Sequence, residues 1–252
     1  MQILIGCAKD MTRGLGTELV LHEPRFQDEA RQHALQMMNY SPEELRNMLH
    51  ISPALAKETW LRYQHFLDDS PLQAALLAYT GVVFKHMGLA HFTSEDFSYA
   101  QAHLWITSFL YGLLRPLDGI RPYRLEGKVV LPQYDQSMLA YWRPRLTDVF
   151  IASIRDDDGL LLDLASNEMR GFFDWKRVER EVRVVRPEFL VEKEGVLKQV
   201  TVYAKMCRGA MAGHALRQRL ALPEALQDFT FEGFAFAYNK DAKTPLFIMN
   251  DR

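Results

Sequence analysis

The sequence has 252 residues, of which 48% are hydrophobic and 25% are charged, and its formal net charge at pH 7 is −2. This composition excludes an intrinsically disordered chain. The net charge excludes attraction of nucleic acid by the molecule as a whole, so such binding would require a local basic patch. The chain has two cysteines without a C-x-x-C spacing, no signal-peptide pattern and no long apolar run, which predicts a cytoplasmic protein that does not enter a membrane.

The first half of the chain reads as one strand followed by helices. Residues 1–8 (MQILIGCA) predict a short buried strand. A helical pattern extends from about residue 27 to 99, with helix starts marked by serine before proline at 41–42 and 52–53 and by acidic residues after Ser94. We expect a helix from Phe97 to Leu114, because the residue before Pro116 avoids the α conformation.

The second half reads mainly as strands. We expect a helix at 136–155 that is bent at Pro144, a buried strand at 159–166, a hairpin of 181–193 with 196–205, a helix at 208–220, and strands at 229–240 and 245–250 joined by a turn. This order predicts an α+β fold with helices around a mixed β-sheet, in a single domain that spans residues 1–252.

The segment LYGLLRPLDGIRPYRLE (110–126) has three arginines among prolines and tyrosines, namely Arg115, Arg121 and Arg124. A guanidinium group grips phosphate or carboxylate at two points and is always charged. The prolines would hold the segment stiff, and Tyr111 and Tyr123 would stack on a base or orient an arginine. The alternative is a surface turn whose arginines pair with Asp118 and Glu126.

Basic residues also occur in YAKMCRGAM (203–211), which we expect to lead from a strand into a helix. Lys205 and Arg208 would then lie at the N-terminus of that helix, where free backbone N–H groups favour an anion. The alternative is that both side chains extend into water. Lys9 adds a single cation after the first strand.

Polar residues follow the predicted strand in LLDLASNE (161–168), and these are Ser166, Asn167 and Glu168. Open α/β sheets bind ligands past the carboxyl ends of their strands. Alternatively, Ser166 only caps the next helix. Glu232 precedes Gly233 inside an aromatic strand, where the glycine indicates a bulge or a close backbone approach.

Several activities are excluded, because the chain lacks a Walker A loop, a dinucleotide fingerprint, G-x-S-x-G and H-E-x-x-H. The histidines are scattered, so we expect no metal site and no cofactor. Cys7 and Cys207 each lie near a basic residue, which would lower a thiol pKa and leaves a redox role open.

In chain order, the motifs Ala8-Lys9, TGVVF (80–84), LYGLLRPLDGIRPYRLE, DLASNE, YAKMCRGAM and FEGFAF resemble the pattern of the YaaA family of bacterial peroxide-stress-resistance proteins over nearly the whole chain. The resemblance implies a cytoplasmic protein that helps bacteria survive hydrogen peroxide and limits damage by free iron. It further implies a mixed α/β fold with a basic cleft, a helix-hairpin-helix-like element, and binding of duplex and branched DNA. No enzymatic activity follows from it.

The chain departs from the family pattern at Cys7, Gly127, Met169 and Cys207, where the family usually has proline, methionine, tyrosine and alanine. Gly213 stands where relatives carry another arginine, which would thin the basic surface. LYGLLRP has only Gly112, whereas a helix-hairpin-helix usually has two glycines.

Two functional hypotheses follow. In the first, a monomeric stress protein binds duplex or branched DNA through phosphate contacts from Lys9, Arg115, Arg121, Arg124, Lys205 and Arg208. In the second, the same cations hold a small anionic substrate in a pocket of an enzyme or small-molecule binder, with polar groups from Tyr111, Asp118, Tyr123, Ser166, Asn167, Glu168 and Glu232. Direct iron ligation has no support, since no cluster of histidines and carboxylates is visible. Cations that converge favour the pocket, and cations spread along a track favour DNA.

Overall fold

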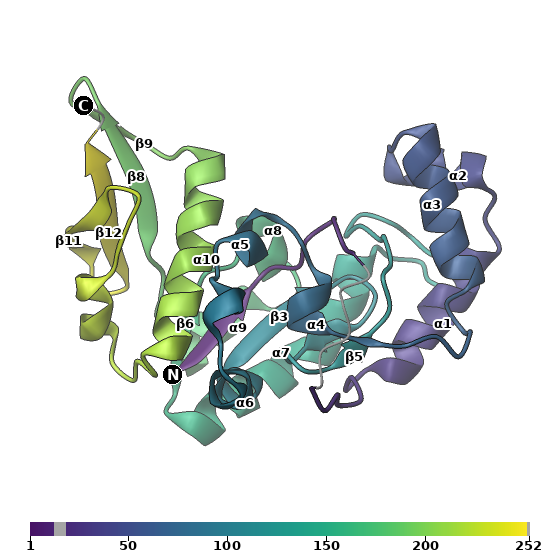
Figure 1. Ribbon diagram of the computed structural model, residues 1–252, viewed down its shortest axis with the longest axis horizontal. Helices are drawn as coiled ribbons and strands as arrows, with labels where there is room; N and C mark the ends of the chain where they lie inside the picture. Colours follow the sequence, from purple (N-terminus) through teal and green to yellow (C-terminus); the bar gives the residue numbers. More distant parts are fainter. Residues whose placement is uncertain (13–18, 251–252) are drawn as a thin grey trace.

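The computed structural model describes residues 1–12 and 19–250 (Figure 1). The helices are α1 (Gln27–Met38), α2 (Pro42–Leu49), α3 (Pro53–Gln64), α4 (Ala75–Ala78), α5 (Val82–Lys85), η1 (Leu89–His91), α6 (Ser94–His103), α7 (Met138–Asp157), α8 (Asn167–Arg170), α9 (Trp175–Glu181), α10 (Thr201–Arg217) and η2 (Pro223–Asp228). The strands are β1 (Gln2–Ile5), β2 (Gln73–Ala74), β3 (Leu104–Ser108), β4 (Gly112–Leu114), β5 (Gly119–Ile120), β6 (Leu160–Asp163), β7 (Arg183–Val185), β8 (Glu188–Lys193), β9 (Val196–Lys198), β10 (Thr230–Phe231), β11 (Phe234–Asp241) and β12 (Thr244–Asn250).

The first sheet has the strand order β4-β3-β1-β6-β7. β1 pairs in parallel with β3 on one side and with β6 on the other, β7 continues in parallel beside β6, and β4 is antiparallel to β3. Every residue of β1, β3 and β6 is buried, which agrees with their nearly continuous apolar sequences. The chain goes from β1 to β3 and later returns past β1 to β6, so the strand order reverses between β1 and β6.

The second sheet has the order β10-β11-β12-β8-β9, with β8 parallel to β12 and the other pairs antiparallel. The helix α10 lies between this sheet and the centre of the molecule (Figure 1), where it contacts β8 and also β1. Buried side chains of both sheets belong to one contiguous hydrophobic cluster. No helix in the described ranges has the length and apolar character needed to cross a membrane.

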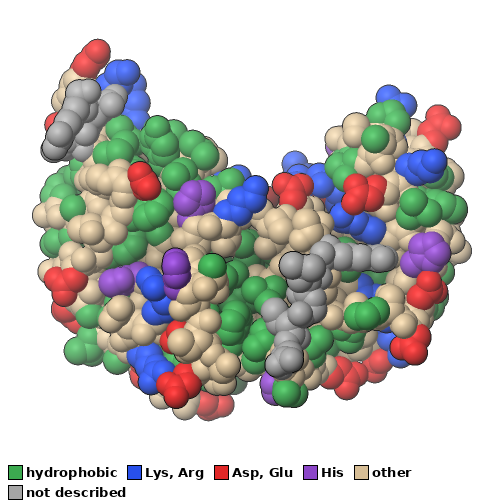
Figure 2. Space-filling model, viewed as in Figure 1, with side chains coloured by type: hydrophobic (Ala, Val, Ile, Leu, Met, Phe, Trp, Pro, Cys, Tyr) green, Lys and Arg blue, Asp and Glu red, His purple; other side chains and the backbone are tan. Residues whose placement is uncertain are grey.

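The helices α1 to α3 form a separate lobe on the far side of the molecule from α10 (Figure 1). Ser41 and Ser52 cap α2 and α3, and a proline occupies the first turn of each helix. Figure 2 shows that the surface is hollowed between this lobe and the lobe formed by α10 and the second sheet. Lys, Arg, Asp and Glu side chains all lie along the floor of that hollow.

The predicted α+β fold is confirmed, although the strands divide between two larger sheets and a small β2–β5 pair. The first strand, the helix starts at 42 and 53, the long helix α7 with Pro144 inside it, and the last strand occur as predicted. The strand predicted at 229–240 is divided into β10 and β11.

The predicted helix from Phe97 to Leu114 is confirmed only as far as His103 and is wrong beyond it. The helix α6 ends at His103, and Leu104–Ser108 forms β3 at the side of β1. A run of Leu-Trp-Ile-Thr suits a buried strand, and pairing with the sheet outweighed the helical pattern. Gly112 takes a left-handed backbone conformation where β4 begins, with φ of 73°. LYGLLRP is therefore half of a β-hairpin and not part of a helix-hairpin-helix.

Two further predictions are corrected. Residues 203–205 belong to α10, which begins at Thr201, and are not part of a strand. Glu232 and Gly233 are the two loop residues of the β10–β11 hairpin, with φ of 48° and 84°, and do not form a bulge inside a strand. Positive φ at both positions is the signature of a tight hairpin turn, which explains the glycine.

Candidate functional site

The position of α10 is set by two glycines that touch the chain around α5. A Cβ atom at Gly209 would overlap the carbonyl oxygen of Val83, and one at Gly213 would overlap that of Met87. The expectation that Gly213 thins a basic surface is therefore wrong, because this buried position has no space for any side chain. This close packing fixes the position of α10, and of the side chains that it carries, relative to α5 and β1.

A pocket of about 330 Å³ opens where β1, β6, α5 and α10 meet, and we call it the switch-point pocket. It lies past the carboxyl ends of β1 and β6, where the strand order reverses, and this is where open sheets of this type bind ligands. The lining comes from Gly6–Asp10 after β1, Gly81–Phe84, the segment 164–169 after β6, and Lys205 and Arg208 on α10. Four of the six sequence motifs thus meet at one cavity.

The charged groups on one side of this pocket have no direct partners. Neither Lys205 nor Arg208 forms a hydrogen bond or an ion pair with any residue that the structure describes, and the same holds for the carboxylate of Glu168. Burial lowers the pKa of Arg208, and the charge of Asp163 partly offsets that effect. A partly buried guanidinium without a hydrogen-bonded anion is energetically unfavourable, so the pocket is suited to receive one.

Ser166 also faces the pocket and occupies the residue position before α8. Its side chain forms no capping hydrogen bond, although Glu168 lies in the first turn of α8 as the capping alternative requires. Ser166 therefore does not act as a side-chain cap in this structure.

Lys9 enters the pocket from the loop after β1 and is tied to the arginine-rich segment. Its ammonium group lies 2.9 Å from a carboxylate oxygen of Glu126, and a guanidinium nitrogen of Arg124 lies 3.7 Å from the same oxygen. The Arg124 side chain is 10% exposed, and its Nε atom is buried without a hydrogen-bond partner in the described structure. Glu126 thus occupies the space between two cations.

A buried aspartate lies directly before the pocket-lining segment that follows β6. Asp163, at the end of β6, accepts hydrogen bonds from Nε of Arg170 at 2.7 Å and from Nε of Arg186 at 2.9 Å. Neither Asp163 nor these two arginines was predicted as part of a site. A charged residue inside the apolar strand GLLLDLAS was the available signal, since a buried carboxylate requires a partner.

The inner wall of the pocket includes Cys7, which is close to a buried chain of hydroxyl groups. The hydroxyl of Tyr123 is 2.9 Å from that of Tyr79 and 2.7 Å from Oγ of Ser108. Burial raises the pKa of the Cys7 thiol to about 12, although hydrogen bonds with the Phe109 backbone and Thr107 oppose it. Burial likewise raises the pKa of Cys207 to about 12. The prediction that nearby basic residues lower the thiol pKa values is therefore wrong.

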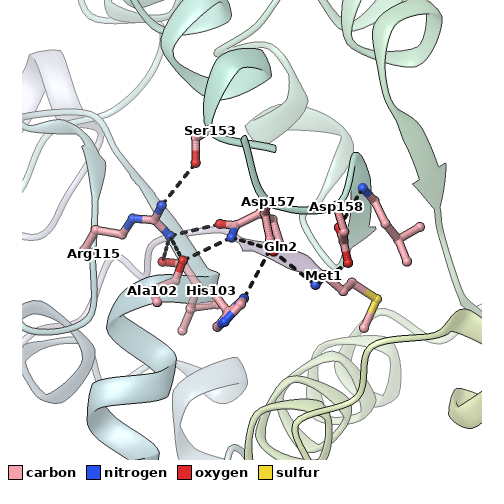
Figure 3. Close-up of polar contacts among 10 residues, drawn as sticks. Met1, Gln2, Ala102, His103, Arg115, Ser153, Asp157 and Asp158 are labelled. Carbon is pink, nitrogen blue, oxygen red and sulfur yellow. Dashed lines mark hydrogen bonds and ion pairs between the residues drawn. The ribbon is translucent and has the colours of Figure 1, made fainter. Parts of the chain in front are cut away.

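Arg115 lies away from this pocket and is held by the protein itself (Figure 3). Its guanidinium donates to Oε1 of Gln2 and to the carbonyl oxygen of Ala102, both at 3.1 Å, and to Oγ of Ser153 at 3.1 Å. It also lies 3.3 Å from the centre of the Trp105 ring. Burial lowers its pKa to about 10. These contacts join the start of β1 to α6 and α7.

The remaining predicted residues of the arginine-rich segment also have internal roles. Arg121 donates to the hydroxyl and carbonyl oxygens of Ser70. Tyr111 and Tyr123 are 1% and 3% exposed, so neither ring is accessible for stacking on a base. Asp118 is buried, and its carboxylate accepts a hydrogen bond from the backbone N–H of Arg115 at 2.8 Å. Arg115 and Asp118 are therefore paired, as the surface-turn alternative expected, but through the backbone of Arg115 and not through its guanidinium.

Two candidate polar groups line other cavities. Asn167 accepts a hydrogen bond from Arg170 and faces a neighbouring hollow with Trp175. Glu232 faces a small cavity on the other side of α10.

Lys205 and Arg208 lie in the second and third turns of α10, not at its N-terminus, because the helix begins at Thr201. The pocket therefore combines Lys9, Ser166, Glu168, Lys205 and Arg208. Within the described ranges, no group of three or more His, Cys, Asp or Glu side chains is arranged to hold a metal ion.

Comparison with known proteins places the chain in a family. The family model described as "Peroxide stress protein YaaA" matches residues 1–240. The chain belongs to this family. It is 49% identical to a UPF0246 protein of Bacteroides thetaiotaomicron over 99% of this chain and 98% of that protein. A UPF0246 protein of Phocaeicola vulgatus is 52% identical over 94% of both chains, and one of Acaryochloris marina is 37% identical over 83% of both.

The resemblance found in the motifs is thereby confirmed, and with it a connection to peroxide stress. Membership of this YaaA family also explains why motifs distant in the sequence belong together. Four of them contribute to the switch-point pocket, whereas Arg115 and Arg121 of the arginine-rich segment form hydrogen bonds within the protein away from it.

Proposed function

We propose that the switch-point pocket binds a small anionic ligand, and that the protein acts through this ligand in the cytoplasm under peroxide stress. The observation that carries the proposal is that Lys205, Arg208 and Glu168 converge on one cavity and that their side chains have no direct partner among the described residues. Two cations beside a carboxylate and a serine hydroxyl suit a phosphate or carboxylate compound that also carries a hydrogen-bond donor. The same set would serve an enzyme, with Glu168 as the acid–base group.

Thermal denaturation with added anions tests this proposal. Inorganic phosphate, nucleoside monophosphates and dicarboxylates are the probes, and at least one should raise the melting temperature of the purified chain in a saturable way. Lys205→Ala and Arg208→Ala should abolish the shift. Lys128→Ala, which removes an exposed lysine outside the pocket, is the matched control. Absence of any saturable shift, or shifts unchanged in the two pocket variants, would reject the proposal.

A second proposal is binding of duplex or branched DNA by the monomer in the hollow between the two lobes. It is supported by the Lys and Arg side chains along that hollow (Figure 2). The helix pair α2–α3 is the candidate for the helix-hairpin-helix-like element. His50 ends α2 in a left-handed conformation with φ of 51°, and Ser52 caps the start of α3.

Gel-shift titration with duplex and four-way-junction DNA at several salt concentrations separates the two proposals. If DNA binds, each phosphate contact should contribute about 0.9 to the slope of log affinity against log salt. Lys57→Glu on α3 should then weaken DNA binding without changing the response to small anions. If no DNA binds even at low salt, the DNA proposal is rejected and the pocket proposal stands. Protection from iron-dependent damage would be indirect in either case.

A further inference from the structure

A smaller cavity lies on the other side of α10 from the switch-point pocket and is rich in sulfur. Its volume is about 160 Å³, and it lies between α10 and the strands β10 to β12. Its lining contains three sulfur side chains, three aromatic rings and one carboxylate, contributed by Met206, Cys207, Met249, Tyr203, Phe231, Phe234 and Glu232. At 100° per residue, the positions 203, 206 and 207 face away from Lys205 and Arg208.

The sulfur atoms are brought together by separate segments of chain. Cys207 is a free cysteine with no exposed surface, and Met206 precedes it on the same helix. Met249 comes from β12 and lies under the Glu232–Gly233 turn, because a Cβ atom at Gly233 would be 3.6 Å from its sulfur. The tight turn holds the Glu232 carboxylate at the rim, close enough for its charge to act on the Cys207 thiol.

Thiolate and thioether sulfurs are soft ligands, which select copper(I) over magnesium, calcium or iron(II). We propose that this cavity is a copper(I) site in which Cys207, Met206 and Met249 supply the sulfur ligands, with the thiolate of Cys207 neutralising the charge of the ion. The three aromatic rings form the rest of the lining. This site is independent of the proposed anion pocket and goes beyond the expectation of a protein without metal.

Binding is a proton exchange without electron transfer. The copper–sulfur bond forms as the S–H bond of Cys207 breaks, the proton leaves to solvent, and the metal remains copper(I) throughout.

The alternative role of these side chains is plain packing, in which methionines fill a gap beside aromatic rings. If the side chains serve only for packing, the cavity should not bind copper(I). Replacement of either methionine by leucine would then change stability slightly and nothing else.

Anaerobic titration of the reduced full chain with copper(I), in competition with the coloured chelator bicinchoninate, distinguishes the two roles. The wild type should retain one metal ion per chain and should show a thiolate-to-copper absorption band in the ultraviolet. Cys207→Ser should lose both, and Met206→Leu and Met249→Leu should each lower the affinity. Cys7→Ser removes the other cysteine, which lies in the switch-point pocket, and should leave binding unchanged.

Failure of the wild type to hold copper(I) against the chelator would overturn the proposal, and so would retention of full affinity by Cys207→Ser. If the serine variant does not fold, as judged by circular dichroism without metal, the leucine variants decide the question. Unchanged affinity in both of them would equally reject the site.

Discussion

Gly209 of α10 lies directly against the carbonyl oxygen of Val83 in the α5 segment, with no space for a side chain between them. This contact positions Lys205 and Arg208 over the end of β1, because both residues are on the same helix as the glycine. The backbone contact therefore determines the geometry of the charged pocket.

Gly209→Ala should lower the free energy of unfolding by about 1–3 kcal/mol, since the methyl group overpacks a contact between two backbones. Urea denaturation measures this loss. Lys205→Ala, on the same helix but exposed, is the control and should change stability little. A Gly209→Ala variant as stable as the wild type would show that α10 shifts without cost.

Arg115→Met should lower the free energy of unfolding by about 1–3 kcal/mol, because it removes the partly buried hydrogen bonds from the guanidinium to Gln2 and Ser153. Arg115→Lys should recover little of this lost stability, since an ammonium group does not reproduce the planar guanidinium above Trp105. Chemical denaturation of both variants checks this. Arg180→Met, which removes a largely exposed guanidinium, should have a small effect. A direct ligand contact by Arg115 would instead appear as lost anion binding at unchanged stability.

Asp118→Asn should change how stability depends on pH. Burial raises the pKa of Asp118 to about 6 from its ordinary value of 3.8. The folded state therefore binds the proton more tightly than the unfolded state, so this carboxyl's contribution is most favourable below pH 3.8 and is lost as pH rises to about 6. The loss corresponds to roughly 3 kcal/mol, since each pKa unit is worth about 1.36 kcal/mol.

The amide introduced by Asp118→Asn keeps an acceptor for the Arg115 backbone N–H but does not ionise. The free energy of unfolding of this variant relative to wild type should therefore increase between acid and neutral pH. Urea titrations on either side of the pKa of Asp118 measure this difference. A constant difference across that range would contradict the raised pKa.

Glu126→Gln should strengthen anion binding at the switch-point pocket by several-fold. The substitution removes the carboxylate that pairs with Lys9, so this cation of the pocket lining becomes available to a ligand. The same anion titrations measure the effect. Glu58→Gln removes an equal charge from an ion pair with Arg62, away from the pocket, and is the matched control. Equal gains in the two variants would indicate a general effect of net charge.

The local signals in the sequence were sufficient for many elements. Ser41-Pro42 and Ser52-Pro53 start α2 and α3, and the apolar runs at 2–5 and 160–163 form buried strands. These features depend on capping, on fixed proline geometry and on burial, all of which act within a few residues. Lys9, Ser166 and Glu168 were recognised as polar groups at element ends for the same reason, whereas Lys205 and Arg208 lie within α10 and not at its N-terminus.

Long-range contacts decided the rest. Leu104–Ser108 is a strand because β1 pairs with it, and Val202–Ala204 is helical because α10 must pack closely against α5. The three arginines of LYGLLRPLDGIRPYRLE look equivalent in the sequence, yet Arg115 and Arg121 bind internal acceptors and Arg124 is paired with Glu126. By itself, the sequence determined the family, the fold class and the kinds of residue in the site. Only the tertiary structure decided which charges meet, because the partners of a charged side chain lie on segments that are distant in the chain.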